Sequence, residues 1–332
     1  MNAPVDPKEA TSEAADAAPS AALPPLECVR AGSLVAEIVP AIGGSLAAFY
    51  RAGTGDAPRR DWLRAADRDA LASRSPLQMA CFPLLPWCNR IRDGRFDWNG
   101  RRIQLSPNQH GSPHTIHGIG WQRPWHVTAR TASRLDLRFD EPGRGEWPFA
   151  FSAQQRYELG PDGLAITLTL QNTGSETMPA GIGHHPYFPH RRDGAGTRVH
   201  AAVAAMWLAD AEVMPTVLSA TDPAVAALGT GMRLADFDLD NNFTGFRHNA
   251  RVTWPDQSSL LLAAEPPLDF FVLYCPAAEK HFVIEAVSNC TDWINLRDRV
   301  DHDRIGGAAL APGETLAATT RFVPSLPGQA HL

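Results

Sequence analysis

The feature of this sequence that most constrains its fold is an alternation of apolar and polar residues with a period of two. This spacing places alternate side chains on one face of a β-sheet. The clearest case is the stretch 149–170, where the alternation runs on both sides of the turn sequence Pro161-Asp162-Gly163. Proline, aspartate and glycine in succession are typical of a tight turn. The pattern predicts an antiparallel hairpin over these residues.

A second hairpin is predicted around Asn99-Gly100, with Phe96 and Trp98 before the turn and Ile103 and Leu105 after it. Asn-Gly supplies the positive φ values that a type I′ turn requires. Further strands are expected at 33–39, 124–129, 134–139, 251–254, 259–264, 270–275 and 281–287.

Helix signals are few. Asp61 is expected to cap a short helix through residues 62–66, and the alanines at 201–205 are ambiguous. Strands at short spacing, separated by many of the 26 glycines and 28 prolines, indicate an all-β antiparallel sandwich. We expect one domain over 26–325, between a disordered tail at 1–25 and a short tail at 326–332.

The charge balance argues against two classes of partner. The 332 residues carry a net charge of −6 without a long run of either sign, so neither nucleic acid nor a membrane is expected to bind. The five cysteines form no C-x-x-C pair, which argues against a disulfide framework. The first 25 residues lack the basic start and apolar stretch of a signal peptide, so a cytoplasmic location is expected. The sequence leaves the oligomeric state open.

Several histidines lie in stretches rich in glycine and proline, which is typical of loops that hold sites: His110, His114 and His117 in one stretch, and His184, His185 and His190 in another. The residue before a proline favours extended backbone, so His184 and His185, which precede Pro186, are expected to point to opposite sides. Only one of the two can face a pocket at that point.

A carboxylate interrupts the apolar strand predicted at 281–287. Glu285 shares its face with Val283 and Val287, so it lies either at a sheet edge in water or in a pocket that raises its pKa. The run Asn89-Arg90-Ile91 follows an apolar stretch, and its arginine either forms a surface ion pair or donates to a polar ligand. Asp240 opens a polar stretch that is either a turn or part of a site.

Taken in order, these pieces resemble the aldose 1-epimerase (galactose mutarotase-like) family over about 30–325. The resemblance rests on Asn89-Arg90-Ile91, Gly94-Arg95-Phe96, Ile116-His117-Gly118, His185-Pro186-Tyr187-Phe188, Asp240-x-x-Phe243 and Glu285.

The resemblance implies a β-supersandwich that binds a sugar in an open cleft without a metal or an organic cofactor. Glu285 matches the general base of the family and His185 its general acid. His117 matches a second histidine that holds the sugar near its ring oxygen. Arg90 and Asp240, with the adjoining Asn89, match residues that bind sugar.

The implied activity is the isomerase reaction that interconverts the α and β anomers of a hexose or related aldose. It needs a base at the C1 hydroxyl and an acid at the ring oxygen, which Glu285 and His185 supply.

Four alternatives stay open. A hexose-6-phosphate mutarotase would use arginines such as Arg191-Arg192 or Arg101-Arg102 at the rim of the pocket. A carbohydrate-binding protein of the same fold would lack catalysis. A zinc hydrolase would use His110, His114 and His117. A glycosidase would need a second carboxylate beside Glu285, for which the sequence offers no comparable strand.

Overall fold

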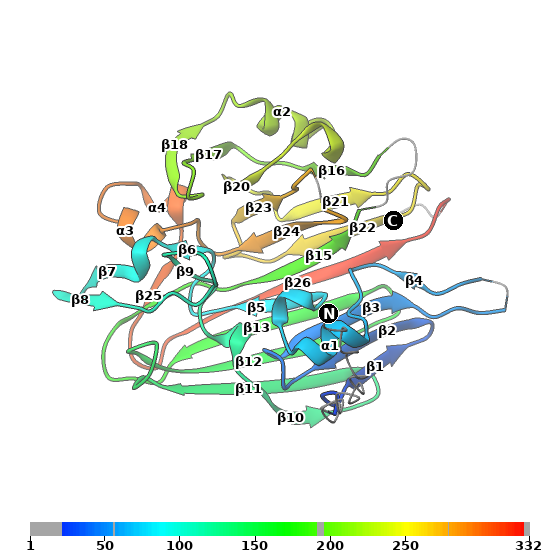
Figure 1. Cartoon of the computed structure of the whole chain (residues 1–332), viewed down its shortest axis with the longest axis horizontal. Helices are drawn as coiled ribbons and strands as arrows, with labels where there is room; N and C mark the ends of the chain where they lie inside the picture. Colours follow the sequence, from blue (N-terminus) through cyan, green and yellow to red (C-terminus); the bar gives the residue numbers. More distant parts are fainter. Residues whose placement is uncertain (1–21, 56, 191–195, 278, 329–332) are drawn as a thin grey trace, which may run out of the picture.

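The computed structural model describes residues 22–55, 57–190, 196–277 and 279–328. Most of the regular structure in these ranges lies in two large antiparallel sheets (Figure 1). The first sheet contains, in spatial order, β1 (Glu27–Ala31), β2 (Leu34–Val39), β3 (Ser45–Arg51), β5 (Cys81–Leu84), β15 (Gly183–Pro189), β24 (His281–Val287), β23 (Phe270–Tyr274), β20 (Asp240–Thr244), β17 (Ala205–Ala209) and β18 (Pro215–Ser219), with β4 (Arg60–Asp61) paired to β3.

The second sheet contains, in spatial order, β10 (His126–Arg130), β11 (Arg134–Pro142), β12 (Ala150–Leu159), β13 (Leu164–Asn172), β26 (Thr315–Ser325), β22 (Ser259–Ala264), β21 (Asn249–Thr253), β16 (Arg198–Ala201) and β19 (Met232–Arg233). Three two-stranded sheets pair β6 (Arg90–Ile91) with β9 (Thr115–Ile116), β7 (Arg95–Trp98) with β8 (Arg101–Gln104), and β14 (Met178–Ala180) with β25 (Ala308–Leu310). The all-β antiparallel sandwich predicted from the sequence is confirmed.

The helices are short and lie outside the sheets. The α-helices are α1 (Arg68–Ser73), α2 (Pro223–Thr230), α3 (Trp293–Leu296) and α4 (His302–Ile305), and single 3₁₀ turns occur at Pro76–Gln78, Arg92–Gly94, Gly120–Gln122 and Leu234–Asp236.

Both predicted hairpins are present. Strands β12 and β13 pair from Phe151 with Asn172 to Leu159 with Leu164, on either side of the predicted turn. Strands β7 and β8 meet at Asn99 and Gly100, which have φ values of 49° and 73°. Positive φ at both residues is the signature of the type I′ turn expected there.

The helix predicted after Asp61 is wrong. Residues 62–66 form no helix: Trp62 and Leu63 lie in a bend. The backbone N–H groups of Trp62, Arg64 and Ala66 donate to the carbonyls of Phe49, Tyr187 and Ala47 on the first sheet. Trp62 and Leu63 are fully buried by this pairing. The helix begins six residues later, at Arg68, where Asp67 accepts a hydrogen bond from the N–H of Ala70 as its N-cap. Tertiary packing therefore overrides the local capping signal.

The main core lies between the two large sheets. Apolar side chains from both sheets, among them Phe49, Ile284 and Ile166, are fully buried in one cluster. Polar contacts also cross this layer, since the hydroxyl of Tyr157 donates to the carbonyl of Gly44 over 2.7 Å. The opposite face of the first sheet is left to form the cavity described below.

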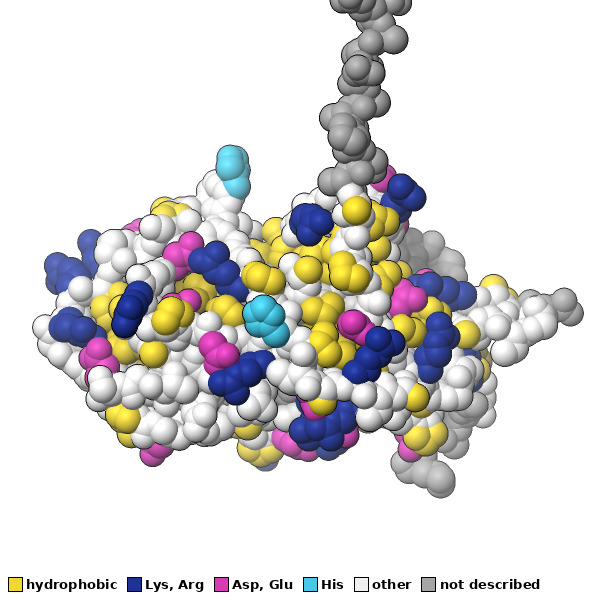
Figure 2. Space-filling view, turned by 90° about the horizontal axis from the view of Figure 1, so that it is seen from below, with side chains coloured by type: hydrophobic (Ala, Val, Ile, Leu, Met, Phe, Trp, Pro, Cys, Tyr) yellow, Lys and Arg dark blue, Asp and Glu magenta, His cyan; other side chains and the backbone are white. Residues whose placement is uncertain are grey.

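The described strands extend from Glu27 to Ser325, while residues 1–21 and 329–332 of the two predicted tails lie outside the described residues. The single-domain extent of 26–325 stays a prediction. None of the described helices is long and apolar enough to cross a membrane. On the face shown in Figure 2, acidic and basic side chains of the described residues are interspersed, and hydrophobic side chains gather toward the middle.

Candidate active site

A cavity of about 240 Å³ lies against the first sheet, and six residues predicted from the sequence line it. They are Asn89, Arg90, His117, His185, Asp240 and Glu285. A larger cavity of about 750 Å³, near α4 and the start of β23, contains none of these six residues. The smaller cavity is therefore the candidate site, because the predicted acid, base and polar residues line it and none of them lines the larger cavity.

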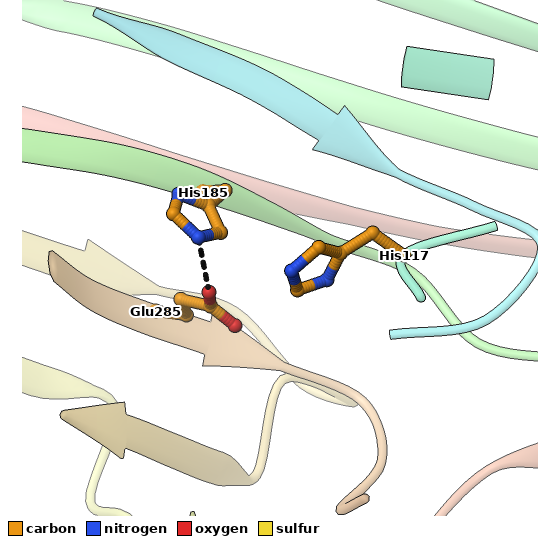
Figure 3. A group of neighbouring side chains, drawn as sticks. All are labelled: His117, His185 and Glu285. Carbon is orange, nitrogen blue, oxygen red and sulfur yellow. Dashed lines mark ion pairs between the residues drawn. The ribbon is translucent and has the colours of Figure 1, made fainter. Parts of the chain in front are cut away.

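Two neighbouring strands bring a histidine and a carboxylate into contact in this cavity. Strand β15 pairs with β24 so that Gly183 meets Val287 and Tyr187 meets Val283, which sets His185 opposite Glu285. Nε2 of His185 lies 3.3 Å from Oε1 of Glu285, as Figure 3 shows. Glu285 is only 2% exposed, and β24 is an inner strand of the sheet, so Glu285 does not lie at an edge in water.

His117 approaches the same point from a loop that follows β9. Its backbone has φ +61°, its N–H donates to the carbonyl of Asn89, and its ring Nδ1 accepts from the N–H of Asn89 at 3.3 Å. A neutral imidazole that accepts at Nδ1 carries its proton on Nε2. In Figure 3 the far edge of the His117 ring points toward His185 and Glu285, so Nε2–H is a hydrogen-bond donor aimed at the cavity.

Gly118 makes this loop conformation possible. Its φ is +73°, and a Cβ at this position would lie 1.7 Å from the carbonyl oxygen of Leu85. Any side chain would push the loop, and with it His117, away from the sheet.

Arg90 and Asp240 lie at the mouth of the cavity and contact each other. Arg90 Nη2 lies 3.3 Å from Asp240 Oδ2, and Nη1 of the same arginine donates to Oδ1 of Asn89. Strand β20 presents Asp240, so the polar stretch that begins there is part of a sheet and not a turn. Together the three side chains place hydrogen-bond donors and acceptors in the same cavity as the His185–Glu285 pair.

The comparisons with known proteins agree with this geometry. The sequence profile described as aldose 1-epimerase matches residues 29–323. The chain belongs to the aldose 1-epimerase family. Its curated relatives include the uncharacterized protein YphB of Escherichia coli K12, which is 29% identical over 284 residues, covering 82% of this chain and 90% of YphB.

Solved structures of this family share the fold. An Escherichia coli K12 protein provisionally assigned as an aldose 1-epimerase superposes with a TM-score of 0.79 at 26% identity, covering 91% of this chain and 99% of the other. A galactose mutarotase-like protein of Clostridium acetobutylicum superposes with a TM-score of 0.78 at 20% identity, covering 90% and 94%. The resemblance read from the sequence motifs is confirmed at the level of family and fold.

Burial dominates the electrostatics of this epimerase-family site. It lowers the pKa of His185 to about 3, with a further contribution from the nearby cation of Arg64. Burial also raises the pKa of Glu285 well above its usual range, and Asp240 adds to this shift. The lowered pKa of His185 disfavours a second proton on the His185–Glu285 pair, and the raised pKa of Glu285 disfavours loss of the remaining proton. The pair therefore holds a single proton over a wide pH range.

The three central side chains suit hydrogen bonding better than metal binding. Among the residues that the structure describes, one group of three side chains could supply ligands to a metal ion. It consists of His117, His185 and Glu285, whose ligand atoms lie within 4.8 Å of one another. A metal ion would need the lone pair of His117 Nε2, but the N–H of Asn89 at Nδ1 keeps the proton on Nε2. Metal binding would therefore require that hydrogen bond to break.

Other residues named from the sequence lie elsewhere. His184 points to the far side of β15, where its Nε2 contacts Oε1 of Gln155 at 3.1 Å, so the pair does point to opposite sides as expected. His114 is buried and accepts from the N–H of Asp93, and His110 is exposed. The zinc site predicted as an alternative from His110, His114 and His117 is therefore not assembled.

The arginines considered for a phosphate do not line the cavity in the described part of the chain. Arg101 pairs with Glu176 and Arg102 with Asp97, and both arginines of β8 are exposed. Arg191 and Arg192 lie outside the described residues.

Sequence reasoning missed several lining residues, notably Gln109, Tyr274 and His281. Strand parity is a signal that identifies some of them. His281 is four residues before Glu285 on the same strand and so shares its face. Val272 pairs directly with Glu285, which places Tyr274 on the same side. No spacing rule points to Gln109, because it comes from a loop.

Proposed function

We propose that this chain is an aldose 1-epimerase that interconverts the α and β anomers of a free hexose or related aldose. The observation that carries the proposal is the contact between Nε2 of His185 and Oε1 of Glu285 inside a cavity rimmed by Arg90 and Asp240. An acid and a base that share one proton and face one small cavity are what ring opening of a pyranose requires.

The proton balance fits the reaction. Burial favours the tautomer with the shared proton on Glu285. The tautomer that starts the reaction has this proton on His185, with Glu285 ionised. Glu285 takes the proton of the C1 hydroxyl while His185 gives its proton to the ring oxygen, so the C1–O5 bond breaks and an open-chain aldehyde forms. Rotation about C1–C2 followed by the reverse transfers closes the ring as the other anomer. The pair carries one proton before and after each transfer to or from the sugar, which agrees with the number of protons that the two pKa shifts imply.

His117 and the rim residues hold the sugar in this scheme. The Nε2–H of His117 donates to the ring oxygen region, and its neutral state is maintained because burial lowers the pKa of His117 well below its usual range. Arg90, Asp240 and Asn89 bind hydroxyl groups. Fixed orientation of the sugar between the acid and the base contributes to the rate beyond the proton transfers themselves. The cytoplasmic location expected from the sequence stays a prediction.

Polarimetry of freshly dissolved α-sugars, over a panel of free and phosphorylated hexoses, tests the proposal. We expect the wild-type chain to accelerate mutarotation of at least one free aldose. Glu285→Gln keeps the size of the side chain but removes the base, and we expect it to reduce the enzymatic rate by about 10²–10⁴-fold.

Circular dichroism and thermal melting of Glu285→Gln establish that the fold is retained. A variant that keeps the full rate would reject Glu285 as the base. Sugar binding without any acceleration by the wild-type chain would favour a carbohydrate-binding protein instead. Activity confined to phosphorylated sugars would favour the hexose-6-phosphate mutarotase.

A further inference from the structure

The ring of His185 lies face to face with the ring of Phe82 on the neighbouring strand. Strand β5 pairs with β15 so that Phe82 is directly opposite His185. The two ring centroids are 4.5 Å apart and the planes differ by only 14°. Phe82 is fully buried and is not among the described residues that line the cavity, so it has no route to contact a sugar.

The charges around His185 make its protonated form costly. The titratable or charged groups that face it are Arg64 after β4, Arg90 on β6, His117 after β9, Tyr187 on β15, and His281 and Glu285 on β24. Arg64, His281 and Arg90 all disfavour a positive imidazole. Glu285 is the one carboxylate within ion-pair distance of His185 among the described residues.

Of the two aromatic rings closest to His185, only Phe82 offers a free face to an imidazolium. The Tyr187 ring is tilted by 46° relative to His185, at 4.7 Å. The guanidinium of Arg64 already lies over that tyrosine ring, 3.7 Å from its centroid. Phe82 instead presents its negative face in parallel to His185, and a cation over an aromatic face is stabilised by the ring quadrupole.

We propose that Phe82 is a positioning residue for the acid step: it fixes the plane of the His185 ring and stabilises its imidazolium form through the aromatic face. This inference rests on the proposed function, in which His185 delivers a proton to the ring oxygen. Trp121 extends the stack, since its ring lies 5.2 Å from Phe82 at an angle of 25°. Packing against Trp121 fixes the position of the Phe82 ring, and the Phe82 ring in turn fixes the orientation of the His185 ring.

Fluorinated phenylalanines at position 82 test the aromatic face separately from packing. One, two and three ring fluorines weaken the quadrupole in steps and change the shape of the side chain little. We expect kcat for mutarotation to fall in the same order, by roughly 2–30-fold in total, with KM unchanged. The matched control is the same series at Phe188 on β15, a fully buried residue that stacks on Phe282 at 5.3 Å and 18° and has no lysine or arginine over its ring among the described residues. We expect that series to leave kcat unchanged.

A second readout does not depend on activity. The ring nitrogens of ¹⁵N-labelled His185, assigned by comparison with His185→Gln, report protonation of the imidazole as the pH is lowered. We expect protonation to require a lower pH with each fluorine added at position 82. A flat response of both kcat and the nitrogen shifts would overturn the inference and leave Phe82 as packing only. A wild-type chain without mutarotase activity would refute the proposed function, while the nitrogen shifts would still decide whether Phe82 stabilises the imidazolium.

Discussion

His184 provides a quantitative test of how buried histidines set the acid stability of this chain. The side chain is 3% exposed, lies between the two large sheets and contacts Gln155 through Nε2. Burial lowers the pKa of His184 to about 3. In the unfolded chain the pKa of a histidine is about 6.5. We propose to replace it by glutamine, which keeps an amide near Gln155 and does not titrate in this range.

The direction in which stability changes with pH follows from proton uptake by the unfolded chain. Between about pH 6 and pH 4 the unfolded chain binds a proton at His184 and the folded chain does not, so stability is lost as the pH falls. One such group reduces the free energy of unfolding by about 1.4 kcal/mol per pH unit in this window. From pH 6.5 to pH 4.5 the loss from His184 alone amounts to about 2 kcal/mol, a substantial part of a typical stability of about 5–15 kcal/mol.

Urea unfolding at several pH values between 6.5 and 4.5 measures this slope, with tryptophan fluorescence and circular dichroism followed together to verify a single transition. We expect the slope of His184→Gln to be shallower than that of the wild type by one proton. His110→Gln is the control, because it makes the same substitution at an exposed histidine outside the core. Parallel lines for wild type and His184→Gln would refute the reasoning, whatever the difference in stability at neutral pH.

Three further predictions concern the active site. His185→Ala should lower kcat strongly while His184→Gln retains most of it; polarimetry that shows the reverse would mean that the wrong histidine of the pair is assigned as the acid. The enzymatic rate should stay nearly constant from about pH 5 to pH 8, because the raised pKa of Glu285 and the lowered pKa of His185 keep one proton on the pair; a midpoint near ~6.5 in the rate profile would indicate an isolated histidine instead. Exhaustive chelation should leave the rate unchanged, and a loss that zinc restores would show that the His117 tautomer argument is wrong.

Much of the fold could be predicted from local pattern. The hairpins around Pro161-Asp162-Gly163 and Asn99-Gly100 were predictable because turn chemistry and strand parity agree there. The helix expected after Asp61 does not form, because a capping residue is a weak local signal and the burial of Trp62 and Leu63 favours hydrogen bonding of this segment to the first sheet. Order of the strands in the two sheets is a long-range property, and no local pattern specifies that β5, β15 and β24 are neighbours.

In the candidate site, too, some features follow from local sequence pattern and others depend on long-range contacts. The opposite orientations of His184 and His185 follow from extended backbone before Pro186. Whether Glu285 lay at an edge or in a pocket could not be decided from its strand, because the answer depends on which strands flank β24. The tautomer of His117 depends on a backbone N–H that is 28 residues away in sequence, and only the structure reveals it.

The register of three adjacent strands links the fold to the chemistry. Phe82 faces His185 across one ladder, and His185 faces Glu285 across the next, so the stacking partner, the acid and the base lie in one row across β5, β15 and β24. A shift of β15 by one residue would turn His184 into the cavity and move His185 into the core beside Gln155, because side chains alternate along a strand. Both histidines are buried, and Nε2 of the one that faces the core contacts the side-chain amide of Gln155. Only the observed register of β15 therefore places His185 next to Glu285 and leaves His184 in the core. The pairing of β15 with β5 on one edge and with β24 on the other fixes this register.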